Sequence, residues 1–133
     1  MASSRLTISQ QDVDFVNKVQ SELDGLCALA PDWDGYGAPV IDPAVIDAAR
    51  SFMANFPDQR APRPRVVPMS NGTLQLEWHH GDKSLELEFE SPSSIRYLRW
   101  HPDQQVEDED SFPIADVETT RSLIRWFVTG IGE

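Results

Sequence analysis

A β-hairpin between Thr73 and Glu90 constrains the fold more than any other part of the sequence. Apolar and polar residues alternate along both arms, and Gly81 and Asp82 provide a two-residue turn between them. A period of two predicts strands with one apolar face, which is formed by Leu74, Leu76, Trp78, Leu85, Leu87 and Phe89. A shift of one residue would turn all of these side chains toward solvent, so the pairing register is well determined.

The segments on both sides of the hairpin predict an α+β fold. Apolar residues at spacings of three and four indicate three helices, over about 9–30, 43–56 and 117–129. Short strands are expected at 65–69 and 95–101. We therefore predict two N-terminal helices, a four-stranded antiparallel meander and a C-terminal helix, with the helices packed on one face of the sheet. Residues 1–133 are expected to form a single domain in which residues 1–8 are flexible.

The formal net charge of −11 limits the kinds of partner that the chain can bind. A strongly acidic surface repels phosphate backbones, which argues against direct contact with nucleic acid and favours a protein partner with a basic surface. We predict an exposed acidic loop at residues 102–113, where the carboxylates are densest. Its candidate partner-binding residues are Asp103, Glu107, Asp108, Glu109 and Asp110. The alternative is that these carboxylates only keep the protein soluble.

Cysteine content and hydropathy constrain where the protein resides. The only cysteine, Cys27, cannot form an intramolecular disulfide, which suits a reducing compartment. The first eight residues are too short and too polar for a signal peptide, and no apolar run reaches 18 residues. We therefore expect a cytoplasmic protein that does not contact a membrane.

The most distinctive loop, residues 31–39, combines prolines, glycines, acids and aromatic residues. Its candidate ligand-binding residues are Asp32, Trp33, Asp34 and Tyr36. Two carboxylates beside two aromatic side chains could hold a small ligand or act as an acid and a base. The structural alternative is that Trp33 packs between the helices and that Asp34 caps a turn. The loop does not follow a strand and lacks the glycine spacing of a phosphate-binding motif.

A second candidate ligand site lies on the outward face of the hairpin. Its residues are Glu77, His79, Glu86 and Glu88. Carboxylates and imidazoles bind divalent metals, but this spacing matches no known metal motif, and alternating glutamates are common on a solvated strand face. Nucleophilic catalysis has no support, because Cys27 has no flanking signature and no Gly-x-Ser-x-Gly is present. We expect no cofactor.

Four short motifs follow one another through the middle of the chain. They are Trp-Asp-Gly-Tyr-Gly-Ala-Pro at 33–39, Val-Val-Pro at 66–68, Leu-Glu-Trp at 76–78 and Leu-Glu-Leu-Glu at 85–88. Together they resemble a group of small bacterial and phage-associated proteins that has no assigned activity. The resemblance covers about Trp33 to Phe89 and supplies no catalytic residue. It implies a mobile-element setting, in which small acidic proteins act as inhibitors or accessory factors.

These observations lead to three functional hypotheses. The first is an acidic, non-enzymatic protein-binding module, in its sharper form an inhibitor that mimics nucleic acid toward a basic partner, as an anti-CRISPR or other anti-defence protein would. The second is a small metal- or ligand-binding domain of hydrolase type that uses the Asp32, Asp34 and Tyr36 loop or the hairpin face. The third is a structural or self-associating protein, such as a homodimer paired through the edge strand near Val66.

Overall fold

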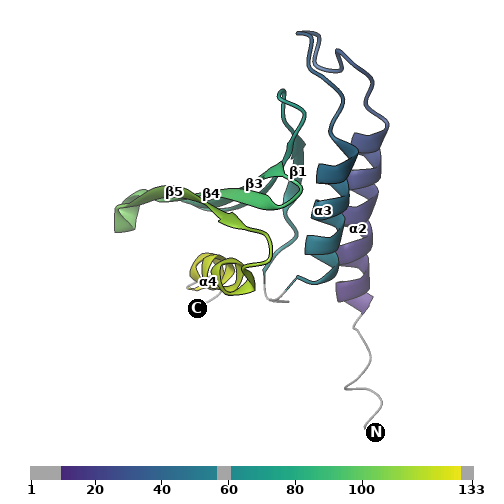
Figure 1. Ribbon diagram of the computed structural model, residues 1–133. Coiled ribbons are helices and arrows are strands. Elements are labelled where there is room, and N and C mark those ends of the chain that lie inside the picture. Colours follow the sequence, from purple (N-terminus) through teal and green to yellow (C-terminus); the bar gives the residue numbers. More distant parts are fainter. Residues whose placement is uncertain (1–9, 57–60, 130–133) are drawn as a thin grey trace, which may run out of the picture.

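The computed structural model describes residues 10–56 and 61–129, without the side chains of residues 10–15. The segment 1–8, which we predict to be flexible, lies outside the described residues. The fold is α+β, and the three described helices lie against a five-stranded antiparallel sheet (Figure 1). The elements are α2 (Gln10–Cys27), α3 (Pro43–Ala54), β1 (Arg65–Pro68), β2 (Leu74–His80), β3 (Lys83–Ser91), β4 (Ser94–His101), η1 (Pro102–Gln104), β5 (Val106–Pro113) and α4 (Val117–Val128). None of the described helices has the length and apolar character needed to cross a membrane.

The predicted hairpin is present and forms the middle of the sheet. Strands β2 and β3 pair with Leu76 opposite Leu87 and Trp78 opposite Leu85, which is the register that the alternation requires. Gly81 has a φ of 58°, in the left-handed region that glycine enters without steric cost, and this closes the two-residue turn. The strand order is β1-β2-β3-β4-β5, so each strand pairs with its neighbour in the chain.

The predicted acidic loop at 102–113 and the predicted four-stranded sheet are both wrong. Residues Val106–Pro113 form β5, an antiparallel edge strand paired with β4. The turn η1 and Gln105, which has a φ of 57°, reverse the chain between the two strands. Acidic residues can occupy this strand because alternate side chains point to opposite faces, and Phe112 thereby reaches the core. Carboxylates on an edge strand also oppose pairing with another chain.

The helices cover the apolar face of the sheet. In Figure 1, α2 and β1 lie at one side of the molecule, and α4 lies beneath β3 to β5. The Phe52 ring of α3 packs edge-on against Phe89 of β3, with centroids 5.3 Å apart. The Trp126 ring of α4 lies 5.2 Å from the guanidinium of Arg99 on β4. Helix α2 packs on α3 and β1. The largest fully buried side chains are Trp78, Phe89, Phe127, Leu23, Ile46, Met53, Leu74, Leu76, Leu85, Leu87, Ile95 and Ile124.

The last two helices begin where the sequence predicts. The side chain of Asp42 accepts a hydrogen bond from the backbone N–H of Ala44, and that of Asp116 accepts one from Thr119. These caps satisfy N–H groups that have no partner within the helix. They fix the starts of α3 and α4 and therefore the placement of both helices against the sheet.

Candidate protein-binding surface

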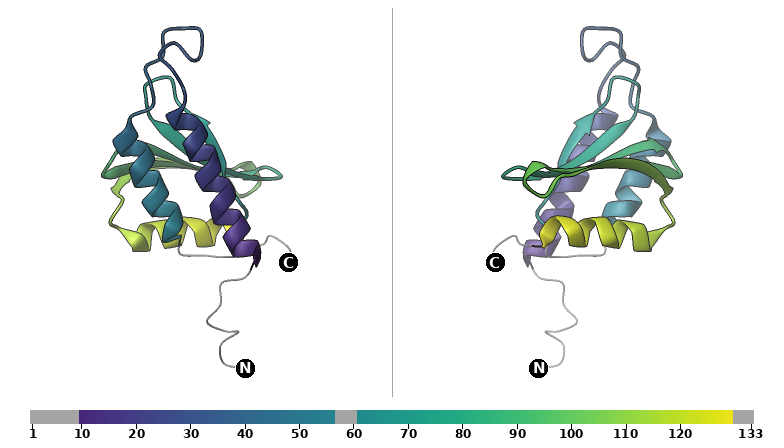
Figure 2. Two further views of the ribbon diagram at one scale, coloured as in Figure 1. Left: turned by 90° about the vertical axis from the view of Figure 1, so that its right-hand side faces the viewer. Right: turned by 90° about the vertical axis from the view of Figure 1, so that its left-hand side faces the viewer.

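No described helix covers the face of the sheet opposite α4, and we call this surface the open face (Figure 1, Figure 2). The strand register places its side chains in three rows that run across the strands. The first row is Arg65, Glu77, Glu86, Leu98 and Glu109, the second is Val67, Gln75, Glu88, Arg96 and Ser111, and the third is His79, Ser84, Trp100 and Glu107. The open face therefore carries five glutamates against two arginines.

Two carboxylates stand directly opposite each other in the first row. Glu77 of β2 faces Glu86 of β3, and the side-chain nitrogen of Gln75 donates to both, at 2.6 Å to Glu77 and 2.9 Å to Glu86. Burial raises the pKa of Glu86 and the nearby Glu77 carboxylate raises it further, while His79 and the Gln75 hydrogen bond oppose the shift. Opposed like charges destabilise a sheet. A basic group brought to this row from outside would relieve the repulsion.

A half-exposed tryptophan lies in the third row of the same surface. Trp100 is 42% exposed, and its cross-strand neighbours are Ser84 on β3 and Glu107 on β5. Leu98, two residues earlier on β4, is half-buried on the same face. Tryptophan combines a large apolar ring with an N–H donor, and it is enriched among the residues that dominate protein interfaces. The open face therefore combines negative charge with an aromatic anchor.

The five acids predicted to bind a partner do not form one continuous surface. Because strand residues alternate, Glu107 and Glu109 belong to the open face, whereas Asp108 and Asp110 point to the side of the helices. Asp103 lies apart from them, in the turn η1. The acidic residues between β4 and α4 therefore do not lie on one side of the molecule. Most of them belong to β5, and their side chains alternate between the two faces of the sheet.

Arginines of β4 pair with two of these acids, one on each face. Arg99 donates to Asp108 from Nε at 2.8 Å and from Nη2 at 2.6 Å, and these hydrogen bonds hold the pKa of Asp108 below its ordinary value. On the open face, Arg96 lies 3.1 Å from Glu109. These pairs neutralise part of the acidic run, and the excess negative charge that remains on the sheet lies mainly with the hairpin glutamates and Glu107.

The hairpin residues considered as the second candidate ligand site share the open face but do not all lie together. Glu77 and Glu86 are neighbours, and the His79 Nε2 atom lies 3.5 Å from Glu77 Oε1. Glu88 lies in the next row and accepts a hydrogen bond from the Thr73 hydroxyl at 3.0 Å. Within the described part of the chain, no group of three or more His, Cys, Asp or Glu side chains is placed to hold a metal ion.

The carboxylates of the loop between α2 and α3 hold the loop's own backbone. Asp34 Oδ1 accepts two backbone N–H groups, from Tyr36 at 2.8 Å and from Ala38 at 3.1 Å. Asp32 Oδ1 accepts the N–H of Gly37 at 2.6 Å. These are the turn contacts typical of aspartate, and they match the structural alternative for Asp34. One oxygen of each carboxylate is thus engaged in holding the backbone of the loop.

This loop presents one aromatic residue to solvent and anchors the other. Trp33 is half-buried against the core, and its indole N–H donates to the carbonyl of Pro39 at 2.9 Å. Tyr36 is 93% exposed between Gly35 and Gly37, which have φ values of 78° and 84°. In Figure 1 the loop rises above the ends of α2 and α3, beyond the turn between β1 and β2 and away from α4.

The chain matches no family model, no curated protein and no solved structure. The resemblance to small phage-associated proteins therefore stays a prediction.

Reasoning from the sequence missed Trp100 as a surface residue and treated the two groups of glutamates as separate candidates. The strand register places both groups on one surface, because Glu109 of β5 lies in the same row as Glu77 and Glu86. One signal was present: Val106 and Phe112 are an even number of positions apart, with polar residues between them, as an alternating strand requires.

Proposed function

We propose that the protein is a non-enzymatic protein-binding module whose open face receives a basic surface of another protein. The observation that carries this proposal is the composition of the open face: five glutamates and two arginines in adjoining rows, beside a tryptophan that is 42% exposed. An acidic surface raises the rate of encounter with a basic partner and disfavours acidic ones.

The electrostatics of the first row support a basic partner in particular. Glu86 carries a raised pKa because it is partly buried and faces Glu77. A lysine or arginine from a partner would favour the charged form of both carboxylates, since an opposite charge nearby stabilises ionisation. Binding should therefore strengthen as the pH rises through the range in which Glu86 loses its proton.

The sharper form of the proposal is an inhibitor that occupies a nucleic-acid-binding site, acting in the cytoplasm. A surface that attracts basic groups and repels phosphates competes with nucleic acid for such a site without binding nucleic acid itself. Tyr36 would supply a second contact, because its loop extends beyond the turn between β1 and β2 (Figure 1) and holds the side chain in the solvent. A pre-ordered loop loses little conformational freedom on binding.

The proposal is tested by capturing proteins from a lysate of the native host with the wild type and with Trp100→Ala. We expect a stoichiometric partner with a basic surface that is retained at low salt and weakened at about 0.15 M salt. Trp100→Ala should weaken its binding by about 2 kcal/mol, roughly thirtyfold in Kd, if Trp100 is the anchor.

Val117→Ala is the matched control, because Val117 is 49% exposed and lies on α4, away from the open face. It should bind as the wild type does. Equal loss in both variants would show that the contact is not on the open face. For the inhibitor form, the captured partner should lose its bound nucleic acid when the protein is added, and simultaneous binding of both would exclude it.

A further inference from the structure

The outer side of β5 is a free edge of the sheet. In the strand order β1-β2-β3-β4-β5 it comes last, and among the described strands it pairs only with β4. It runs for eight residues, Val106–Pro113, without a shift of register. The unpaired edge of a strand presents a row of N–H and C=O groups that can pair with a strand of another chain.

The opposite edge of the sheet, β1, is protected in ways that β5 is not. β1 has only four residues and ends at Pro68, which has no N–H group, and Pro62 and Pro64 stand shortly before it. Helix α2 also packs on β1. Short length, proline and a covering element are common protections of a sheet edge. In β5 the proline is the final residue, so residues 106–112 all keep their N–H groups. β5 is therefore the edge that remains open to pairing.

The backbone of β5 shows which of its residues face outward. In an antiparallel pair, the N–H and C=O of one residue point the same way, and those of the next residue point the opposite way. The N–H of Ile114 donates to the Ser93 carbonyl at 2.9 Å, so the even-numbered residues face β4. The N–H of Ser111 donates instead to Oδ1 of the Asp110 side chain, at 2.8 Å. The odd-numbered residues of 107–111 therefore direct their backbone groups away from the sheet.

Two glutamates carry outward backbone groups that have no partner among the described residues. They are Glu107 and Glu109, and neither forms a hydrogen bond on this side with another described element. Both side chains are exposed and belong to the open face. Arg96 lies 3.1 Å from Glu109, whereas Glu107 forms no ion pair with a described residue. The free backbone groups and the unneutralised carboxylate thus lie at the same edge.

The charge of β5 determines which strand could pair with it. The strand contains four acids and no base. A second copy paired through β5 would bring carboxylates opposite carboxylates, which destabilises a sheet. A strand with lysine or arginine opposite the glutamates meets no such repulsion, because opposite charges in cross-strand pairs are stabilising. The carboxylates therefore exclude the protein's own copy and select a basic chain.

We propose that β5 accepts a basic, extended segment of the partner protein as a further antiparallel strand of the sheet. Residues opposite Glu107 and Glu109 exchange both backbone hydrogen bonds with them and place lysine or arginine side chains on the open face. The basic side chain opposite Glu107 continues the row that contains Trp100. This inference rests on the proposed function, and it names the part of the basic partner that the open face receives.

The probe is a capped, fluorescently labelled peptide of alternating lysine and threonine, added to the full-length protein and followed by fluorescence anisotropy. Three forms are compared: unmodified, N-methylated at the lysines, and N-methylated at the threonines. N-methylation removes a backbone donor and leaves the charge unchanged. In the proposed register the lysine N–H groups face β5, so methylation there should weaken binding at least about tenfold. Methylation of the threonines should leave Kd within about twofold.

Two substitutions at Glu109 separate the backbone from the charge. Both remove the carboxylate, but only Glu109→Pro also removes the outward N–H, at an edge position where proline is tolerated. Glu109→Gln should weaken the unmodified peptide by about threefold and Glu109→Pro by at least about tenfold. Should Glu109→Pro fail to fold in a thermal melt, the methylated peptides decide the question, because they leave the protein unchanged.

Amide hydrogen exchange, followed by NMR, locates the pairing residue by residue. The amides of Glu107 and Glu109 should exchange quickly in the free protein and slowly in the presence of the unmodified peptide. Those of Asp108 and Asp110, which face β4, should exchange slowly in both states.

Two results would overturn the proposal. The first is an absence of saturable binding by the unmodified peptide. The second is binding that lysine methylation does not weaken, with the Glu107 and Glu109 amides still exchanging quickly. In that case basic side chains would contact the open face without strand pairing, and the proposed function would stand. Failure of the proposed function itself is seen separately, when the captured partner binds Trp100→Ala as well as it binds the wild type.

Discussion

Replacing Glu86 by glutamine should stabilise the protein at neutral pH. The glutamine keeps an oxygen that can accept the Gln75 hydrogen bond, 2.9 Å long in the wild type, but it removes the charge that faces Glu77. Like charges directly opposed on a sheet destabilise it by about 0.2–1 kcal/mol. The Glu77 side chain is only 16% exposed, so solvent screens the pair weakly. We expect Glu86→Gln to raise the free energy of unfolding by about 0.5–1 kcal/mol at neutral pH.

This gain should depend on pH in one direction. Folding raises the pKa of Glu86 above its ordinary value of 4.5, so the native state holds this proton more tightly than the unfolded chain does. The resulting stability is fully present below the unfolded pKa and is lost as the pH rises through the folded pKa. Glutamine does not titrate. The stability difference between the variant and the wild type should therefore be largest near neutral pH and should shrink as the pH falls toward 4.5.

Urea unfolding at neutral pH and near pH 4 measures this difference directly. Glu107→Gln is the matched control, because Glu107 is exposed on the same face and lies opposite Trp100 rather than a carboxylate. It should change the free energy of unfolding by less than about 0.5 kcal/mol. An equal gain in both variants would refute the reasoning, since the effect would then come from net charge. A gain for Glu86→Gln that does not change with pH would refute it as well.

Three further changes test other parts of the account. Asp108→Asn should lower the free energy of unfolding by about 0.5–1 kcal/mol at neutral pH. Because Arg99 lowers the Asp108 pKa, this loss should disappear in urea melts as the pH falls below 3.8 and on through the folded pKa. Trp78→Phe removes the indole donor to the Pro62 carbonyl, 2.7 Å away, and should cost about 1–3 kcal/mol in thermal unfolding. Gly37→Ala places a side chain at a φ of 84° and should speed hydrogen exchange of the Tyr36 amide without moving the global transition by more than about 1–2 kcal/mol.

The parts of the fold that the sequence predicts are those in which local chemistry and tertiary packing agree. The hairpin has strict alternation and a glycine turn, and Asp42 and Asp116 begin their helices as their position predicts. Strand β5 could not be predicted in the same way, because a dense run of acids is typical of a solvated loop. Its strand conformation depends on pairing with β4 and on the Arg99–Asp108 contact, which are tertiary interactions.

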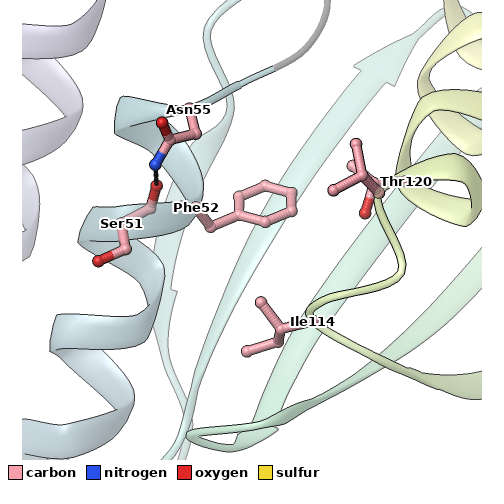
Figure 3. Close-up of a pocket in the computed structure, with 6 residues that line it drawn as sticks. Ser51, Phe52, Asn55, Ile114 and Thr120 are labelled. Carbon is pink, nitrogen blue, oxygen red and sulfur yellow. Dashed lines mark hydrogen bonds between the residues drawn. The ribbon is translucent and has the colours of Figure 1, made fainter.

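The residue types of the candidate site could be predicted from the sequence, but not their placement together on one face of the sheet. The alternation predicts an acidic face for the hairpin, and composition predicts a basic partner. The joining of Glu86 and Glu109 into one row requires the register of β3, β4 and β5 together, which no single segment encodes. A cavity of about 300 Å³ between α3 and α4, lined by Phe52, Ile114 and Thr120 among others (Figure 3), could not be predicted either, because it arises between elements that are far apart in the chain.

The most direct test of the central claim compares two double variants with the same change in net charge. Glu107→Gln with Glu109→Gln removes charge from the open face, and Asp47→Asn with Glu118→Gln removes it from exposed helix positions. Binding to the captured partner is measured at about 0.15 M salt. The open-face variant should bind at least about tenfold more weakly, and the helix variant should stay within about twofold of the wild type. Equal weakening by the two variants, or none by the first, would contradict the claim that the open face is the binding surface.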